Sequence, residues 1–218
     1  MTERNRDGRP AKGRRLIIGA ACLGLLMLAA VCFVCLDTNT TSADPDSGTC
    51  GENLTWEFDG VDTLTISGSG PMEDYSSKST PWGDYSDVVT TLVIGDGVTS
   101  VSGRAFPYFT HLTSLTLGSG IQTIGDSAFV RCPVTVLTIP DSVVSIGRGA
   151  FESVSVSTLN LGSGVTTIGD YAFGSCESLT ALTLPDSVTS VGEGAFSETG
   201  LTTLTVGRSE ERRVGKEC

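Results

Sequence analysis

The chain repeats itself every 22 or 23 residues between positions 89 and 207, and this period restricts the fold to very few architectures. An Ala-Phe pair returns at the same place in each unit, and so does a leucine that is followed two residues later by Ile, Leu or Val. A fixed period of this length is typical of a solenoid, in which each unit buries its apolar face against the next unit. The two markers are Phe106, Phe129, Phe151, Phe173 and Phe196, and Leu92, Leu115, Leu137, Leu159, Leu182 and Leu204.

One unit, residues 112–133, reads LTSLTLGSGIQTIGDSAFVRCP. Leu115 and Leu117 alternate with the period of two that a strand requires. The Gly-Ser-Gly that follows predicts a tight turn, because glycine tolerates positive φ. We expect a second short strand at 121–124, and then one helical or 3₁₀ turn that directs Phe129 inward. The fold prediction is therefore mainly β: a parallel, right-handed leucine-rich-repeat solenoid with short helical turns.

The repeat pattern L-T-x-L-x-[LI]-[PG]-x-[SG]-V-x-x-I-G-x-x-A-F-x-x-C resembles the BspA-like leucine-rich repeats of bacterial surface proteins. The segment before it, with CGENLTW from Cys50 and the pair Pro81-Trp82, resembles the amino-terminal cap of that family. The resemblance covers residues 50–207. It implies display at the cell surface and, for some members, adhesion to host or partner-cell proteins. The matching residues are core and turn residues, so they say little about a ligand.

Residues 50–88 predict an amino-terminal β-hairpin cap. Residues 54–58 and 63–67 alternate like two strands on either side of an Asp-Gly pair. Both tryptophans, Trp56 and Trp82, lie in this segment together with Tyr75 and Tyr85. A solenoid needs a seal over its first coil, and large aromatic side chains supply apolar area for it. We interpret them as core; a surface that stacks on carbohydrate is the alternative.

The amino terminus predicts one transmembrane helix. Residues 1–15 carry six basic side chains, and residues 16–36 are a stretch of 21 residues without a charge. At ~1.5 Å per residue this stretch spans the ~30 Å hydrocarbon core. The basic flank places 1–15 in the cytoplasm and the repeats outside, as a signal anchor in a bacterial cell membrane. A cleaved signal, cut near Thr41-Ser42-Ala43, is the alternative. Residues 37–49, rich in Thr, Ser and Asp, predict a flexible linker.

The last segment, residues 208–218, breaks the repeat with the sequence RSEERRVGKEC. It lacks the second strand that should follow Val206-Gly207, and it resembles the translation of a sequencing-library adapter. We interpret it as an artefactual tail and exclude it from fold reasoning; a short polar tail is the alternative. We expect the natural protein to continue beyond Gly207.

Charge excludes some partners. Residues 16–207 contain four basic and 20 acidic side chains, a net charge of −16. Nucleic-acid binding needs basic clusters that neutralise phosphate, so we expect no nucleic-acid partner. Anionic lipid surfaces are disfavoured for the same reason. Two pairs of acidic turn positions could at most bind Ca²⁺ weakly along an edge: Asp126 with Asp170, and Asp141 with Asp186. We interpret them as solvated turn residues.

Catalytic and metal-binding signals are poor. His111 is the single histidine, and we interpret it as a surface loop residue. Outside residues 16–36 there is no Cys-x-x-Cys or His pair, which argues against a zinc site. Cys132 and Cys176 hold the same repeat position two coils apart, roughly 10 Å, which exceeds the ~7 Å reach of a disulfide. We predict buried free thiols, no partner for Cys50, no cofactor, no metal and no enzymatic activity.

Candidate binding residues form columns on the exposed face of the main sheet, between the inward positions. The first explanation of a threonine ladder is the β-propensity and cross-strand fit of threonine. The functional interpretation is that this face docks a protein or a glycan. The face lacks Trp, Tyr and Arg, the usual binding hot spots, which favours a weak or spread-out interface. One column is Val93, Thr116, Thr138, Asn160, Thr183 and Thr205, and its neighbour is Thr91, Ser114, Val136, Thr158, Ala181 and Thr203.

The functional prediction is a membrane-tethered, extracellular repeat module for surface display or adhesion. Two alternatives stay open. The first is a structural spacer, and the second is an accessory repeat region of an extracellular enzyme whose catalytic domain is missing. The oligomeric state does not follow from the sequence.

Overall fold

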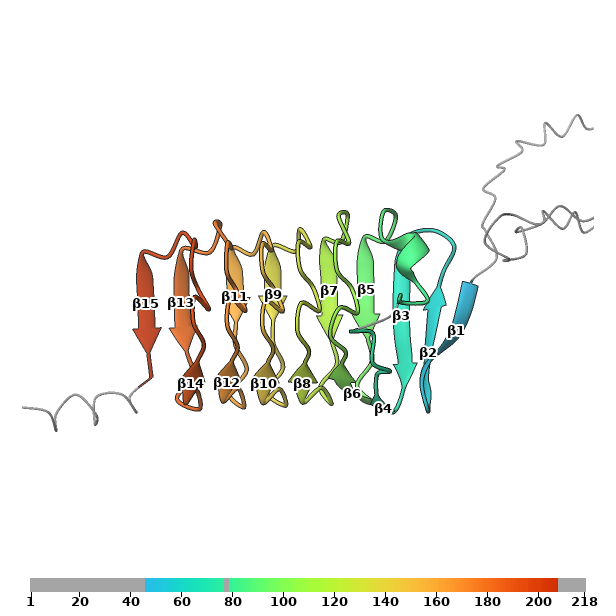
Figure 1. Cartoon of the computed structure of the whole chain (residues 1–218), viewed down its shortest axis with the longest axis horizontal. Coiled ribbons are helices and arrows are strands. Elements are labelled where there is room, and N and C mark those ends of the chain that lie inside the picture. Colours follow the sequence, from blue (N-terminus) through green and yellow to red (C-terminus); the bar gives the residue numbers. More distant parts are fainter. Residues whose placement is uncertain (1–45, 77–78, 208–218) are drawn as a thin grey trace, which may run out of the picture. The chain divides into compact units, whose positions relative to one another are not determined.

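The computed structural model describes residues 46–76 and 79–207, all within one compact unit. This unit is a stack of short, mostly parallel strands (Figure 1), with a single 3₁₀ helix, η1 (Gly83–Tyr85), in the described ranges. No helix in these ranges has the length and apolarity that a membrane span requires. The predicted cytoplasmic segment, transmembrane helix, most of the linker and the artefactual tail lie outside the described residues.

The described strands form two faces of the stack. The main face contains a sheet in the order β1-β2-β3-β5-β7, followed by the pairs β9–β11 and β13–β15. Its strands are β1 (Asp46–Gly51), β2 (Leu54–Phe58), β3 (Thr63–Gly68), β5 (Thr91–Ile94), β7 (Ser114–Leu117), β9 (Val136–Thr138), β11 (Thr158–Asn160), β13 (Ala181–Leu184) and β15 (Thr203–Val206). The second sheet has the order β14-β12-β10-β8-β6-β4. Its strands are β4 (Gly70–Pro71), β6 (Val98–Val101), β8 (Thr123–Ile124), β10 (Ser145–Ile146), β12 (Thr167–Ile168) and β14 (Ser190–Val191).

The repeat register predicted from the leucines is confirmed. Leu92 lies opposite Leu115 in the parallel pair β5–β7, and Leu137 lies opposite Leu159 in β9–β11. The ladder of the main face is interrupted twice: among the described strands, β7 does not pair with β9, nor β11 with β13. The second strand is shorter than expected, since in the unit at 112–133 only Thr123–Ile124 pairs.

A column of stacked rings runs through the core. It begins at Trp82 and continues through the five repeat phenylalanines, with neighbouring ring centroids 5.0 to 5.5 Å apart. Trp82 and the phenylalanines are buried except for Phe196, which is half-buried. Each ring therefore covers the ring of the next coil, as expected for units that cannot bury their apolar faces alone.

The prediction of short helical turns before the phenylalanines is wrong: these segments are turns. Ser127, two residues before Phe129, has φ 53°, and Arg131, two residues after it, has φ 58°. A residue in the left-handed region ends a right-handed helical run, so none forms. Both positions have positive φ in every coil: Arg104, Ser127, Gly149, Tyr171 and Gly194 before the phenylalanine, and Tyr108, Arg131, Ser153, Ser175 and Glu198 after it.

These turns are joined by a third backbone ladder. In one coil, the amides of Ser127, Phe129 and Arg131 donate to carbonyls of the next coil at 2.8, 2.8 and 2.9 Å. The same three bonds recur at Arg104, Phe106 and Tyr108, at Gly149, Phe151 and Ser153, and at Tyr171, Phe173 and Ser175. Because each amide points to the following coil, the turns satisfy backbone groups that would otherwise be buried without partners.

The glycines of the Gly-Ser-Gly turns have a different role from the predicted one. Gly120 and Gly164 are not among the residues with positive φ. A Cβ atom at either position would collide with a backbone carbonyl of the preceding coil, that of Asp96 or of Asp141. Glycine is therefore required here by the close approach of stacked coils, not by backbone conformation.

At the amino-terminal end the strand direction changes. β3 pairs in parallel with β5 but antiparallel with β2, and β2 pairs antiparallel with β1. The antiparallel pairing expected of residues 54–58 and 63–67 is present. Trp56, Tyr75 and Trp82 are buried, as core residues are, and do not form an exposed stacking surface. β1 begins at Asp46, so the end of the predicted linker, residues 46–49, is part of a strand.

Candidate binding face

The predicted binding residues lie on the outer surface of the main face, where the strands alternate inward leucines with outward polar side chains. Eight of the nine are exposed, and Val93 is half-buried. Strand register aligns these residues across paired strands. Ser114 and Thr116 of β7 lie opposite residues of β5, Thr138 lies opposite Asn160, and Thr183 lies opposite Thr205. The full set is Val93, Ser114, Thr116, Thr138, Thr158, Asn160, Thr183, Thr203 and Thr205.

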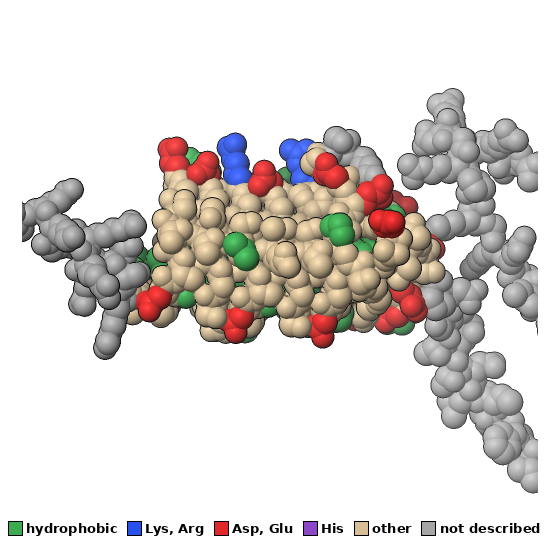
Figure 2. Space-filling model, turned by 90° about the horizontal axis from the view of Figure 1, so that it is seen from below, with side chains coloured by type: hydrophobic (Ala, Val, Ile, Leu, Met, Phe, Trp, Pro, Cys, Tyr) green, Lys and Arg blue, Asp and Glu red, His purple; other side chains and the backbone are tan. Residues whose placement is uncertain are grey.

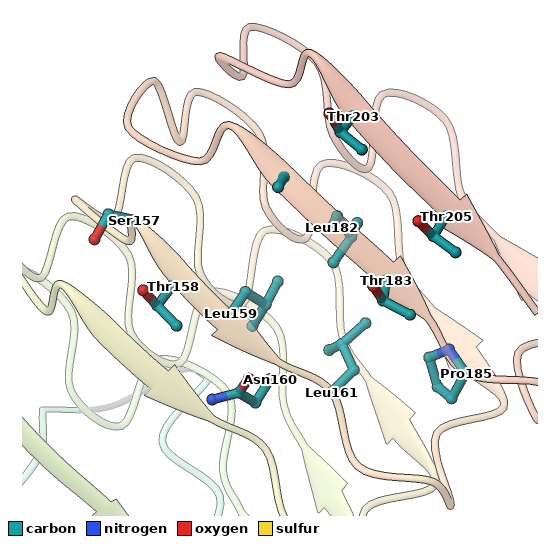
Figure 3. A pocket seen from close by; sticks show the side chains of 11 residues that line it. Ser157, Thr158, Leu159, Asn160, Leu161, Leu182, Thr183, Pro185, Thr203 and Thr205 are labelled. Carbon is teal, nitrogen blue, oxygen red and sulfur yellow. The ribbon is translucent and has the colours of Figure 1, made fainter.

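A groove divides this face where β11 and β13 do not pair. It has a volume of about 440 Å³ and spans β11, β13 and β15 (Figure 3). Leu159, Leu161 and Leu182 point into the space between the strands and supply its apolar part. Five predicted residues line it, namely Thr158, Asn160, Thr183, Thr203 and Thr205. The structure thus brings these five together around an apolar floor, whereas the other four lie outside the groove.

The chemistry of this face is that of hydroxyl, amide and methyl groups. The Asn160 side-chain amide donates to the Thr138 hydroxyl at 3.4 Å, a long bond that leaves the amide available to a ligand. Residues lining the groove carry no ionisable side chain. A ligand held here would bind through van der Waals contact with the leucines and hydrogen bonds to the threonines.

The sequence suggested that the acidic turn residues are simply solvated, but they also accept hydrogen bonds. The Asp141 carboxylate accepts hydrogen bonds from the Ser163 amide at 2.7 Å and from its hydroxyl at 3.0 Å. Asp96 receives the same two bonds from Ser119. These donors favour the charged carboxylate and lower the pKa of both groups. Each aspartate ties one coil to the next, and the described residues contain no cluster of three metal-ligating side chains.

The predicted free thiols are confirmed. Cys50, Cys132 and Cys176 are buried and form no disulfide. Burial raises the pKa of the Cys132 thiol to about 12 and that of Cys176 to about 11, so both are protonated and unreactive near neutral pH. His111 is exposed in a turn, with its Nδ1 3.2 Å from the Thr110 hydroxyl.

Sequence reasoning missed a second surface, on the turns around the phenylalanines. Arg104, Arg131 and Arg148 lie there with the exposed rings of Tyr108 and Tyr171. We call these five residues the arginine edge. Each of them lies two or three residues from a repeat phenylalanine, and this spacing was visible in the sequence. Strand alternation, from which the columns on the main face are predicted, does not extend to these turns.

Comparison with known proteins gives consistent results. A family model described as "BspA type Leucine rich repeat region" matches residues 99–218 in six copies. Among solved structures, the pneumococcal vaccine antigen PcpA is similar over 76% of this chain and 51% of that chain, with 19% identity and a TM-score of 0.54. A leucine-rich repeat protein from Bacteroides ovatus is similar over 73% of this chain and 51% of that one, with 19% identity and a TM-score of 0.52. No curated protein matches.

The two structural likenesses show a shared fold, and this chain spans about half the length of either relative. The family match covers more than half of the chain and includes every repeat from β8 onward. It agrees with the observed parallel register and with the phenylalanine column. The chain therefore belongs to the BspA-type leucine-rich repeat family.

Proposed function

We propose that the chain is a repeat region displayed at a bacterial cell surface, where it binds an extracellular protein or glycan through the main sheet face. The observation that carries this proposal is the groove of about 440 Å³ on a face of exposed hydroxyls, with Leu159, Leu161 and Leu182 lining its floor. A sheet whose strands all paired would present a flat surface. Solenoids use such extended sheet faces for binding.

Tethering to the membrane is part of the same proposal. The 21 uncharged residues at 16–36 are long enough to span a bilayer, and the basic residues before them favour a cytoplasmic amino terminus. Deleting residues 16–36 should move the protein from the membrane fraction to the soluble or secreted fraction. Retention of the deleted form in washed membranes would show that the tether lies elsewhere.

The binding face can be tested with one matched pair of variants. Thr183 and Thr167 are both exposed strand threonines, on β13 of the main sheet and β12 of the second sheet. We expect the full chain to bind at least one member of an array of extracellular-matrix proteins and neutral glycans. Thr183→Arg should then weaken binding about tenfold or more, because the long cation fills the groove, and Thr167→Arg should not. Equal binding by both variants would move the site off this face.

A structural spacer is the second candidate, and one observation favours it. The groove contains no Trp, Tyr or Arg, the residues that dominate most binding hot spots. A spacer predicts that the full chain binds nothing on the array and that Thr183→Arg and Thr167→Arg are indistinguishable from it. The same experiment therefore separates the two proposals.

A further inference from the structure

All three arginines of the described residues lie on one edge of the solenoid, in adjacent coils. Backbone bonds of the turn ladder fix them there: Arg104 donates to Asp126 O, and Arg131 donates to Glu152 O, both at 2.9 Å. The amide of Arg148 donates to the Asp126 carboxylate at 2.8 Å. In Figure 2 basic side chains stand among acidic ones along one long edge, and the opposite edge shows acidic but no basic side chains. The rest of this acidic molecule therefore offers no second cationic surface in the described part.

The long side chains of the arginine edge sit on backbone that disfavours them. Arg104, Tyr108, Arg131 and Tyr171 have φ values of 54°, 61°, 58° and 54°. Glycine, which adopts this conformation freely, holds the position equivalent to Arg104 and Tyr171 in two other coils. Residues kept in a disfavoured conformation are often functional. Serine and glutamate hold the same two turn positions in other coils, so the strain alone does not identify a ligand.

The guanidinium groups are available to a ligand. Among the described residues none of the three forms an ion pair, although Asp126 and Glu152 line the same cavity. The Arg104 side chain donates to the Ser76 carbonyl at 3.2 Å, and the Arg131 guanidinium lies 5.7 Å from the centre of the Tyr108 ring. The Arg148 side chain has no partner in the part of the chain that the structure describes. Its charge is therefore uncompensated by direct contact.

Two adjoining cavities run along this edge. The larger, of about 770 Å³, is lined by Arg104, Arg148 and Tyr171 with two carboxylates and two serines. The second, of about 440 Å³, is lined by Arg104, Arg131 and Tyr108 among others. They share Arg104, Ser127 and Glu152 as lining residues. Neither has a lining residue in common with the groove on the sheet face. The arginine edge is therefore an independent site.

The lining groups define the chemistry of a ligand. An arginine fork recognises a carboxylate through two parallel hydrogen bonds. The carboxylates of Asp126 and Glu152 and the serine hydroxyls accept hydrogen bonds from hydroxyl groups, and a tyrosine ring offers a flat apolar face. The two carboxylates that line the same cavity as Arg104 and Arg148 repel a densely charged polyanion, and so does the net charge of −16 outside the termini. The best fit is a ligand with isolated carboxylates among many hydroxyl groups.

We propose that the arginine edge binds an acidic glycan, with uronate or sialate carboxylates on Arg104 and Arg148 and a sugar ring against Tyr171. The backbone ladder places Arg104 and Arg148 two coils apart, roughly 10 Å along the stack. A glycan with carboxylates at about this spacing engages both guanidinium groups at once. This site does not depend on the proposed function of the sheet face.

The test uses the full chain on an array of uronate- and sialate-bearing oligosaccharides, each beside its carboxylate methyl ester. Polyglutamate and dextran sulfate represent an acidic peptide and a dense polyanion. We expect binding to carboxylated glycans, at least about tenfold weaker binding to the esters, and little to the two polymers. Equal binding of acids and esters, or preference for either polymer, would overturn the proposal. So would the absence of binding to every carboxylated glycan.

Variants locate the site. Arg148→Gln removes a guanidinium that has no partner among the described residues, so we expect unchanged thermal unfolding and about 10- to 100-fold weaker glycan binding. Tyr171→Asn removes the ring, and asparagine tolerates the backbone φ of 54°. Thr183→Arg is the control, since it alters only the sheet face. If Thr183→Arg abolishes glycan binding while Arg148→Gln leaves it intact, the glycan binds the sheet face and the arginine edge is not the site.

Discussion

The two ends of the described solenoid present the same kinds of apolar residue in opposite environments. At the amino-terminal end, antiparallel strands and the rings of Trp56, Tyr75 and Trp82 cover the first coil, and these rings are 6%, 2% and 0% exposed. At the other end, all four residues of β15 are exposed, and Leu204 has 54% of its surface accessible. Within the described residues β15 pairs with β13 alone.

This difference shows that the contribution of a repeat residue to stability depends on its neighbouring coils. Leu182 and Leu204 occupy the same position in successive coils and lie opposite each other in the β13–β15 ladder. Leu182 is 3% exposed, whereas Leu204 is half exposed. The stability of a solenoid is the sum of the stability of each repeat and the stability of the interfaces between neighbouring repeats. The contribution of a side chain to stability therefore depends on the coils on both sides of it. Substitutions at equivalent positions should therefore differ widely in cost.

The largest effect is expected at the amino-terminal end. Trp82 is fully buried, stacks on Phe106 with ring centroids 5.0 Å apart, and donates from Nε1 to the Ala105 carbonyl at 2.8 Å. Trp82→Ala should lower the free energy of unfolding by about 3–5 kcal/mol, as measured by denaturant titration. Trp82→Phe keeps a ring and should cost less. A loss below about 1 kcal/mol for Trp82→Ala would show that this end does not stabilise the stack.

The matched leucines give the next largest effect and the most direct comparison. Leu182→Ala should destabilise the protein by about 2–4 kcal/mol, because it opens a cavity in a covered coil. Leu204→Ala should cost less than about 1 kcal/mol, because much of its side chain is already in water. Both values come from the same denaturant titration. Equal costs would mean that β15 is covered in solution, which would remove the contrast between the ends.

The rates of thiol labelling should show whether the coils nearer to β15 open more readily than those nearer to the amino-terminal end. Cys132 and Cys176 are buried at the same repeat position, with pKa values raised to about 12 and about 11 by burial. Labelling near pH 8 therefore requires local opening. We expect Cys176, two coils nearer to β15, to react several-fold faster than Cys132 when the labelled peptides are resolved by mass spectrometry. Identical rates over a range of denaturant would indicate that the stack opens as one cooperative unit.

The smallest effect concerns the aspartates between coils. Hydrogen bonds from Ser119 and Ser163 lower the pKa of Asp96 and Asp141 in the folded state. A carboxyl group with a depressed folded pKa stabilises the fold above its unfolded pKa and loses that contribution as the pH falls through the folded pKa. Thermal midpoints should therefore decline modestly between about pH 5 and about pH 2. Asp141→Asn should flatten this decline slightly, whereas Glu177→Gln, at an exposed turn, serves as the control.

The sequence predicted those features that follow from burial with a fixed period. The leucine register, the phenylalanine column and the buried thiols of Cys132 and Cys176 all repeat where an inward position repeats. The left-handed turns were not predicted, because Ser127 and Arg131 carry no residue preference for positive φ, and the conformation depends on hydrogen bonds to the next coil. The predicted helical turns failed for that reason.

The candidate site also has a part that the sequence predicted and a part that it did not. Strand alternation placed Thr183 and Asn160 on an outward face, and they are exposed there. The groove beside them was not predictable, since it lies where β11 and β13 fail to pair, and the repeat pattern is unbroken at that point. Arg104 and Arg148 come together because of the turn ladder, which relates residues by stacking and not by strand alternation.

The turn ladder also gives the solenoid a dipole moment along its axis. The peptide unit that joins Asp126 to Ser127 accepts a bond from Arg104 and donates one to Arg148, whose own peptide unit donates to Asp170. Peptide units are thus joined head to tail along the stack, as they are along an α-helix, so their dipoles add. Neighbouring peptide dipoles in a β-sheet largely cancel. The three parallel rows in the turns therefore place a partial positive charge toward the β15 end, and every added coil lengthens that dipole.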